Sequence, residues 1–318
     1  MDDFAMQATI GFRYVTCDNC GSNESRFLFS GPDRLRGLPG QFSVVQCCVC
    51  NWIRQNPRPV DADLQKYYPD DYASYAKAIE DEKWFWNRWD RNYGVKKQRK
   101  SVERFVSLGR MLEVGCGTGL FLNEMQQRGW FVTGVEPNQY ASSYARKRFD
   151  LNVFQGTLKE YDAAPESFDV VCAWNVVEHL PRPAQDLRRM QVALRKGGLL
   201  VMSVPNLGSL DLRWFGESWM GWDLPRHLYL FPSDALEKFL ERNAMRIIDR
   251  RTVDSSYYHF LLGAQSYLRD HTMISRQNID FLFRVARQFP LRIVTAPAFW
   301  LLDRLGLSPI LTYYIRKD

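Results

Sequence analysis

The feature that most constrains the fold is an apolar stretch that leads directly into a glycine-rich loop and then into a helical pattern. Met111–Val114 is typical of a buried strand, and Gly115-Cys-Gly-Thr-Gly119 follows it at once. Leu120–Arg128 then has the apolar spacing of a helix. Glycines between a strand and a helix let the backbone approach a ligand and turn helix amides toward it. The pattern therefore predicts a nucleotide-type binding loop at the end of a strand.

Strands and helices alternate through the rest of the middle of the chain. The expected strands are Phe131–Val135, Leu151–Phe154, Phe168–Trp174, Leu199–Val204, Met245–Val253 and Ile310–Arg316. The expected helices are Tyr140–Phe149, about Ala184–Leu194, which Lys196-Gly-Gly198 would cap, and Ser233–Arg242. Strands joined by helices form right-handed crossovers, and ligands bind at the carboxyl ends of the strands. We therefore expect an α/β fold, a Rossmann-like doubly wound and mostly parallel sheet.

The flanking segments have other patterns and suggest further units. Their expected order is a zinc-ribbon-like module at 1–60, a helical aromatic lid or linker at 61–107, the sheet domain at 108–254 and 307–318, and a helical insert at 255–306. The first unit has short strands and turns punctuated by glycine and proline, without a helical period. We therefore expect it to be a small separate module.

The spacing of the glycines separates two kinds of nucleotide site. The NAD fingerprint requires G-x-G-x-x-G, whereas here glycine stands at 115, 117 and 119 and Leu120 follows, so that reading fails. An acidic residue that ends the next strand can accept hydrogen bonds from ribose hydroxyls, and Glu136 lies 21 positions after Gly115. The loop and this carboxylate together indicate a nucleoside cofactor other than NAD.

Four motifs in succession identify a family. They are Val114-Gly-Cys-Gly-Thr-Gly119, Gly134-Val-Glu136-Pro137, Ser167-Phe-Asp169 and Asn175-Val-Val-Glu-His-Leu-Pro181. In combination they resemble the motifs of class I S-adenosylmethionine methyltransferases, over about residues 105–253. The resemblance implies that Glu113 contacts the amino acid end of the cofactor and that Glu136 holds its ribose. The cofactor site it implies is formed by Glu113, Gly115, Gly117, Gly119, Glu136, Pro137 and Asn175.

The sequence departs from this family after the third strand. Members often carry an acidic residue beside the adenine, whereas this chain has Gly156-Thr157-Leu158. We therefore expect backbone groups or Thr157 to contact the adenine. Tyr72, in the aromatic segment before the sheet, is a candidate to stack on adenine or acceptor, and packing against the neighbouring domain is the alternative.

Five of the seven cysteines lie near the N-terminus. Cys17-x2-Cys20 and Cys47-x2-Cys50, with 26 residues between the pairs, have the spacing of a four-thiolate structural zinc site, with buried or unpaired thiols as the alternative. The region also resembles the zinc-containing N-terminus of a bacterial group that includes sugar C-methyltransferases. Those enzymes carry a further C-terminal domain without a counterpart in these residues, so the sugar acceptor does not carry over.

Methyl transfer from a sulfonium requires alignment and, for a hydroxyl or carbon acid, removal of a proton. His227 lies in a segment that resembles the substrate-side loop of the same group, and it is our preferred base, with Tyr229 orienting it or the acceptor. His179 follows the fourth strand, and catalysis and loop structure remain equal alternatives for it. A hydrogen bond that pins the loop is the alternative for His227.

The distribution of charged and apolar residues limits the expected binding partners and location of the protein. The net charge is +6, but 42 basic residues are spread among 36 acidic ones, so no nucleic acid partner is expected. The segment 281–304 combines many apolar residues with Arg284, Arg287, Arg292 and Arg304, and it could contact a membrane peripherally, shape a lipophilic acceptor site, or form a helical cap or homodimer face. The N-terminus has no signal pattern and no apolar run could span a bilayer, so a cytoplasmic location is expected.

The sequence thus predicts S-adenosylmethionine-dependent methyl transfer to a hydroxyl or activated carbon of a small molecule, such as a natural product, a sugar or a lipid-linked acceptor. Methylation of RNA or protein is an alternative, although Asn175-Val-Val-Glu178 stands where amine methylases carry an Asn-Pro-Pro-Tyr-type motif. A cofactor-binding scaffold without catalysis is the third hypothesis.

Overall fold

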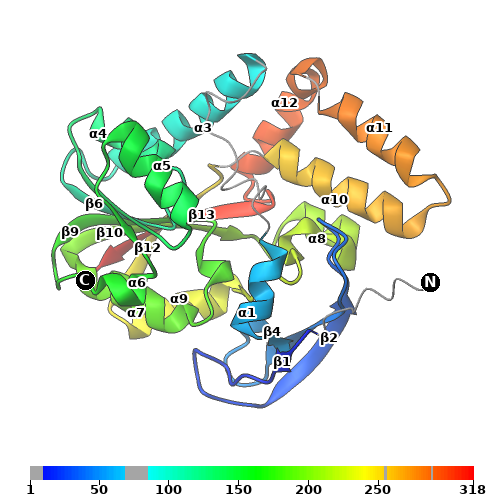
Figure 1. Cartoon of the computed structure of the whole chain (residues 1–318), viewed down its shortest axis with the longest axis horizontal. Helices are drawn as coiled ribbons and strands as arrows, with labels where there is room; N and C mark the ends of the chain where they lie inside the picture. The colour runs from blue at the N-terminus through cyan, green and yellow to red at the C-terminus, as the bar shows by residue number, and fades with distance from the viewer. Residues whose placement is uncertain (1–9, 69–84, 254–255, 288) are drawn as a thin grey trace, which may run out of the picture.

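The computed structural model describes residues 10–68, 85–253, 256–287 and 289–318 (Figure 1). A seven-stranded sheet is the centre of the fold, in the spatial order β12-β13-β10-β9-β6-β7-β8. Its strands are β6 (Arg110–Val114), β7 (Phe131–Glu136), β8 (Val153–Gln155), β9 (Phe168–Trp174), β10 (Leu194–Pro205), β12 (Met245–Arg251) and β13 (Ile310–Lys317). The strands from β10 to β8 are parallel, and β13 runs antiparallel to both β10 and β12. The prediction of a Rossmann-like, mostly parallel sheet is confirmed.

Helices cover both faces of this sheet, as Figure 1 shows. They are α3 (Phe85–Glu103), α4 (Leu120–Gln126), α5 (Gln139–Phe149), α6 (Leu158–Tyr161), α7 (Pro183–Ala193) and α9 (Ser233–Arg242). Met111 and Leu112 are successive residues of β6 and point to opposite faces, as strand geometry requires. Met111 packs with α4 residues such as Phe121, whereas Leu112 belongs to the core that holds Leu187 of α7. Burial on both faces explains why these strands read as continuous apolar runs.

One predicted helix end is wrong. Lys196-Gly-Gly198 does not cap α7, because the helix ends at Ala193 and β10 begins at Leu194. The register between β10 and β9 shifts between Leu194 and Leu199, and Gly197 has a φ of 71°. Glycine supplies the left-handed backbone that such a bulge needs, and it supplies the same conformation at helix ends. The local sequence therefore cannot distinguish the two.

The N-terminal residues form a second sheet, in the order β11-β4-β3-β2. Its members are β2 (Ser25–Gly31), β3 (Phe42–Cys47), β4 (Ile53–Gln55) and β11 (Tyr229–Leu230), while β1 (Phe12–Arg13) pairs separately with β5 (Arg58–Pro59). Thus the last strand of this sheet comes from the loop that precedes α9, more than 170 residues further along the chain. The N-terminal region, which we expected to be separate, shares its sheet with that loop.

The remaining short elements and the insert complete the structure. They are α1 (Asp61–Leu64), η1 (Gln65–Tyr67), η3 (Val177–His179), α8 (Leu210–Phe215), η4 (Gly216–Ser218), η5 (Met220–Trp222), α10 (Ser256–His271), α11 (Arg276–Ala286) and α12 (Phe289–Arg304). The last three helices lie beyond the edge of the sheet, on the same side as α8 (Figure 1). Gly263 of α10 lies against Phe215 of α8, where a Cβ would be only 2.7 Å from the ring, so the insert packs closely on α8.

Candidate functional site

The glycine loop joins β6 to α4 at the carboxyl edge of the sheet. Gly115, Gly117 and Gly119 have φ values of 69°, 53° and 79°, a region that favours glycine. A Cβ on Gly115 would also lie 2.6 Å from the side chain of Val176, in the segment that follows β9. Backbone conformation and close approach therefore both require glycine in this loop, which leads into the N-terminus of α4.

Two buried carboxyl groups flank this loop. The carboxylate of Glu136 accepts hydrogen bonds from the amides of Gly117 at 2.9 Å and Asn138 at 2.8 Å. Glu113 is buried, and its Oε2 has no hydrogen-bond partner within the described parts of the chain. Burial raises the pKa of both carboxyls, and the charge of Glu136 raises that of Glu113 further. Such a pair favours a cationic group placed beside it.

The other residues predicted to contact the cofactor lie in different surroundings. Thr157 caps α6 and its hydroxyl exchanges hydrogen bonds with Glu160, so this side chain has a local structural partner. Pro137 follows Glu136 at the end of β7. Asn175 follows β9 with a φ of 54°, and its amide bonds to Ser203 of β10 at 3.1 Å. Tyr72 lies outside the described residues.

The structure brings the two predicted histidines together. The rings of His179 and His227 lie 4.6 Å apart between centroids and meet edge to face. Nδ1 of His227 is 2.8 Å from the carbonyl of Gly221, and Nδ1 of His179 is 3.0 Å from the carbonyl of Arg226. A carbonyl only accepts, so Nδ1 of His227 carries the proton and donates it, and Nε2 is the basic nitrogen of that ring. Nδ1 of His179 also lies 3.0 Å from the hydroxyl of Tyr68, which can donate or accept.

Burial keeps both rings neutral. It lowers the pKa of His179 to about 3, with a further contribution from His227. Burial also lowers the pKa of His227, although Asp223 opposes the shift. A neutral imidazole has one unprotonated ring nitrogen, which in His227 is Nε2, and can accept a proton there at neutral pH.

A buried arginine holds the segment that carries His227. Arg226 is 0% exposed, and its guanidinium donates to both carboxylate oxygens of Asp33, at 2.7 and 3.1 Å. It also donates to Asp223, at 2.7 to 3.1 Å. Burial disfavours ionisation of Asp223, but Arg226 and His227 outweigh it and lower the pKa of this carboxyl. Asp33 follows β2, so the N-terminal region supplies one half of this ion pair.

A buried glutamine fixes the same segment from β4. The Nε2 group of Gln55 donates to the carbonyls of Pro225 at 2.9 Å and His227 at 2.7 Å. Its backbone amide donates to the carbonyl of Leu228 at 3.1 Å. Sequence reasoning missed Gln55, Asp33 and Arg226, because no local pattern links positions so distant in the chain.

Tyr229, which we expected to orient His227 or the acceptor, is a buried residue of β11. It pairs with Arg54 in the β11–β4 ladder, and its ring packs edge-on against Trp52 with centroids 6.2 Å apart. Burial raises the pKa of its hydroxyl to about 12. Within the described residues, the hydrogen bonds that hold His227 come from Gly221, Asp223 and Gln55 and not from Tyr229.

The four predicted metal ligands converge. The sulfur atoms of Cys17, Cys20, Cys47 and Cys50 all lie within 4.8 Å of one another. Cys17 and Cys50 are 3.4 Å apart, and Cys20 and Cys47 are 3.5 Å apart. A tetrahedral ion with bonds of about 2.3 Å places its sulfurs about 3.8 Å apart, so the cluster has the dimensions of a zinc site. Cys48 is exposed and lies outside the cluster.

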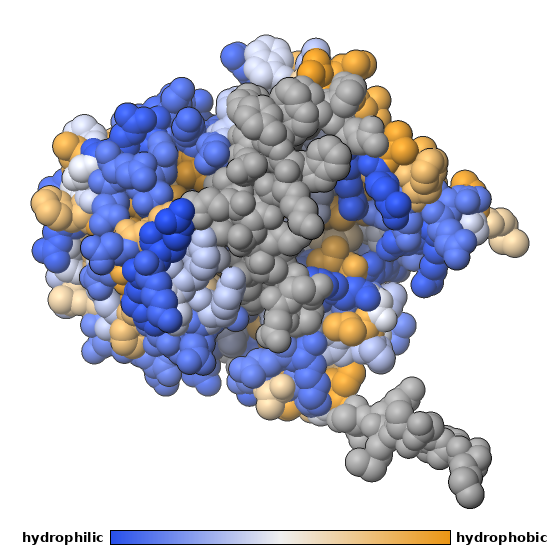
Figure 2. Space-filling view, turned by 45° about the horizontal axis from the view of Figure 1, so that its top comes forward, coloured by the Kyte–Doolittle hydropathy of each residue, from blue (hydrophilic) through white to orange (hydrophobic). Residues whose placement is uncertain are grey.

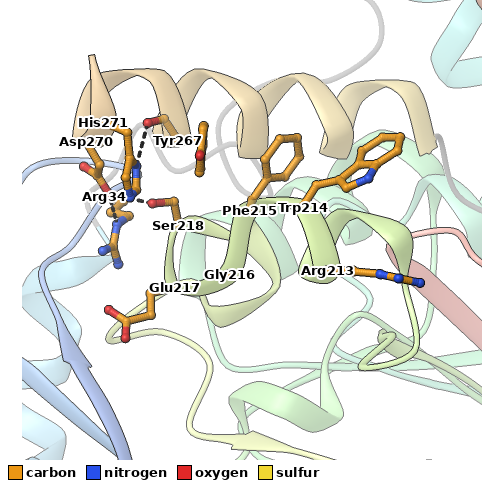
Figure 3. Close-up of a pocket in the computed structure, with 10 residues that line it drawn as sticks. All are labelled: Arg34, Arg213, Trp214, Phe215, Gly216, Glu217, Ser218, Tyr267, Asp270 and His271. Atoms are coloured by element: carbon orange, nitrogen blue, oxygen red, sulfur yellow. Dashed lines mark hydrogen bonds and ion pairs between the residues drawn. The ribbon is translucent and has the colours of Figure 1, made fainter. Parts of the chain in front are cut away.

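Two further features lie near α8. Asp211 is 1% exposed, and burial raises the pKa of its carboxyl to about 7, a group that the sequence did not single out. A hollow of about 470 Å³ runs between α8, η4 and α10 (Figure 3). There Asp270 binds Arg34 at 2.6 Å and Ser218 at 2.7 Å. None of the predicted site residues lines this hollow.

Comparison with known proteins identifies the class. A family model described as "Methyltransferase domain" matches residues 75–248, more than half of the chain, so this chain belongs to the methyltransferase domain family. Among relatives, the ubiquinone biosynthesis O-methyltransferase of Aeromonas salmonicida is 33% identical over 103 residues, 30% of this chain and 43% of the relative. The enzyme of that name from Bradyrhizobium diazoefficiens is 30% identical over 176 residues, 51% of this chain and 69% of the relative. The chain thus spans less than half of the length of the first of these relatives.

Solved structures with partial similarity to this chain are also known. A SAM-dependent methyltransferase from Archaeoglobus fulgidus is 20% identical, with 72% of this chain and 94% of that chain covered and a TM-score of 0.47. The [4+2]-cyclase SpnF is 16% identical, with 82% and 98% covered and a TM-score of 0.48.

Proposed function

We propose that this protein transfers a methyl group from S-adenosylmethionine to a hydroxyl group of a small-molecule acceptor. The observation that carries the proposal is the glycine loop, which lies between two buried carboxyls inside the region that matches the methyltransferase domain. The names of the relatives favour oxygen over carbon as the methylated atom.

The residues at the loop suit this cofactor. S-adenosylmethionine carries a cationic ammonium and a cationic sulfonium, and Glu113 supplies a buried carboxyl whose Oε2 has no other partner within the described residues. Glu136 keeps free lone pairs beyond its two amide bonds, so it can also accept from ribose hydroxyls. When bound, the cofactor supplies an electrophilic methyl group. The protein's own contribution is to hold the acceptor in line and to take its proton.

We assign the proton transfer to the histidine pair. His227 is the proposed base, with Nε2 unprotonated and Nδ1 bound to Gly221. His179 packs against it and is anchored through the carbonyl of Arg226. Because burial lowers the pKa of both rings, the base is neutral at pH 7, and the loss of kcat on its protonation is expected at a lower pH than for an exposed histidine.

Replacement of the base tests this assignment. His227→Gln should lower kcat by roughly 10²- to 10⁴-fold, while binding of S-adenosylmethionine changes little, because the proposed role of the ring is toward the acceptor and not the cofactor. Turnover is measured with radiolabelled cofactor and a panel of phenols, catechols and sugar alcohols, and cofactor affinity by calorimetry. His271→Gln is the matched control, since His271 is exposed at the end of α10.

Near-normal turnover in His227→Gln would refute the role of His227 and leave His179 as the candidate. If the unmodified protein binds the cofactor but methylates no hydroxyl compound, the RNA or protein methylation and scaffold hypotheses become the better explanations.

We also propose that the four-cysteine cluster holds one structural zinc ion. Four thiolates fill a tetrahedral shell and leave no open position for a substrate, so the ion has no part in methyl transfer.

A further inference from the structure

Two helices of the insert expose an unusual amount of apolar surface. On α11 the exposed side chains include Phe281, Leu282 and Val285. On α12 and just beyond it they are Leu291, Ile293, Val294, Trp300, Leu301 and Leu305. In Figure 2 orange side chains gather at the upper right of the molecule, over this part of the insert. Large contiguous apolar surfaces on a folded protein mark a contact with another molecule or with a membrane.

The insert also has a buried core, so its exposed apolar residues are additional to that core. The inward sides of the same helices are packed: Ile279 and Phe283 of α11 are buried with Leu261 of α10. On α12 the ring of Phe299 lies 5.3 Å from that of Tyr257 of α10. The exposed apolar residues are therefore a second, outward set. On α12 they recur at helical spacing from Leu291 through Val294 and Leu301 to Leu305, along one side of the helix.

The charges on these helices are divided by sign. Asp280 is held by Gln265 and Arg269 of α10. Asp303 is held by Ser256 and Ser308, so both carboxylates have neighbouring partners, although the side chain of Asp280 is 42% exposed. Arg287 donates to Gln265 of α10 at 2.8 Å, whereas Arg276, Arg284 and Arg304 are exposed basic residues. Arg304 also lies over the ring of Trp300, with its guanidinium carbon 4.5 Å from the ring centroid. The outward surface is consequently apolar with a cationic border.

We propose that α11 and α12 form a peripheral membrane-binding face that takes an anionic phospholipid bilayer. Apolar side chains enter the acyl region, arginines pair with lipid phosphates at its boundary, and the helices lie in the plane of the interface. Among the described residues no helix is long and apolar enough to cross a bilayer. The cationic border favours anionic lipid over a second copy of this face, because two like-charged borders would repel. This proposal does not depend on the identity of the acceptor.

Vesicle co-sedimentation of the full chain tests the proposal. The protein should sediment with vesicles of phosphatidylglycerol and phosphatidylcholine in equal parts, and much less with phosphatidylcholine alone. Val294→Asp combined with Leu301→Asp should weaken binding by about tenfold or more, because two charges would have to enter the acyl region. Arg284→Glu combined with Arg304→Glu should weaken it to a similar extent and reduce its dependence on salt.

Matched control variants distinguish binding through this face from nonspecific hydrophobic or electrostatic binding. Phe131→Asp changes an exposed apolar residue of β7, and Arg246→Glu changes an exposed arginine of β12. Both should bind vesicles as the unmodified protein does. Equal binding to neutral and anionic vesicles, or unchanged binding in both double variants, would overturn the proposal. So would a dimer in light scattering that Val294→Asp with Leu301→Asp converts to a monomer in the absence of any lipid binding.

Discussion

At the scale of single residues, the buried carboxyls beside the glycine loop are the most informative groups. Glu136 is stabilised by two backbone amides, whereas Glu113 is surrounded by apolar strands and has no such compensation at Oε2 among the described residues. Burial therefore raises the pKa of Glu113, and the neighbouring Glu136 adds to the shift. Without a cation nearby, this carboxyl holds its proton at a pH at which an exposed glutamate is ionised.

Binding of the cofactor should change the protonation of Glu113. A cationic ligand favours the ionised form, so binding of S-adenosylmethionine should lower the pKa of Glu113 and release a proton, and affinity should fall as the pH is lowered. Calorimetric titrations in two buffers of different ionisation enthalpy count the protons released. Glu113→Gln should bind more weakly and release fewer protons. Release of no proton by the unmodified protein would contradict the prediction.

At the scale of elements, the sequence predicted what depends on local periodicity. The strands of the large sheet, the glycine loop and Glu136 at the end of β7 follow from apolar runs and glycine spacing. The hydrogen bonds that place the histidines cannot be predicted from such local patterns. Gln55 and His227 are 172 positions apart, and Asp33 and Arg226 are 193 apart. The pairing of β11 with β4 helps to bring these residues together, and a two-residue strand has no detectable period.

This arrangement predicts that the N-terminal sheet positions the histidines. Asp33→Asn leaves Arg226 paired with Asp223 alone in a fully buried site, and the loss of charge-assisted hydrogen bonds should cost about 1.5 to 3 kcal/mol of stability. If Arg226 orients His179 through its carbonyl, kcat should fall while the affinity for the cofactor stays within a few fold, measured below the unfolding temperature. A variant that is destabilised but has an unchanged kcat would contradict the positioning role.

A second aspartate–arginine pair gives the matched control. Asp61 and Arg13 are joined by a hydrogen bond of 2.5 Å, but both side chains are substantially exposed. Asp61→Asn should change stability by less than about 1 kcal/mol, because exposed pairs gain little net free energy, and it should leave kcat unaffected.

At the scale of the whole molecule, the N-terminal region and the methyltransferase domain share one core. Cys17, Cys47 and Trp52 belong to the same buried cluster as Phe231, Phe239 and strands of the large sheet. Asp18, between two of the clustered cysteines, accepts hydrogen bonds from the amides of Ala184 at 2.7 Å and Gln185 at 3.3 Å at the start of α7. A change at the cysteines should therefore destabilise the whole chain and not only its first residues.

Elemental analysis should find about one zinc per chain, and its loss should reduce global stability. Cys47→Ser should abolish zinc binding and lower the unfolding temperature by roughly 10 °C, since a structural zinc site contributes several kcal/mol. Cys48→Ser is the matched control, because Cys48 is exposed in the same turn and outside the cluster. A metal-free protein with an unchanged unfolding temperature would refute the zinc proposal.

The strand β11 has a consequence for how the chain is made. On the ribosome, β2, β3 and β4 emerge early, but the strand that covers the edge of β4 follows more than 170 residues later. Until then the nascent chain exposes the backbone groups of that edge, and Gln55 and Asp33 lack the partners that satisfy them in the finished fold. Synthesis must therefore pass through the glycine loop and most of the large sheet before the first strands can close. The sheet formed by β2, β3 and β4 is therefore completed after most of the large sheet has been made.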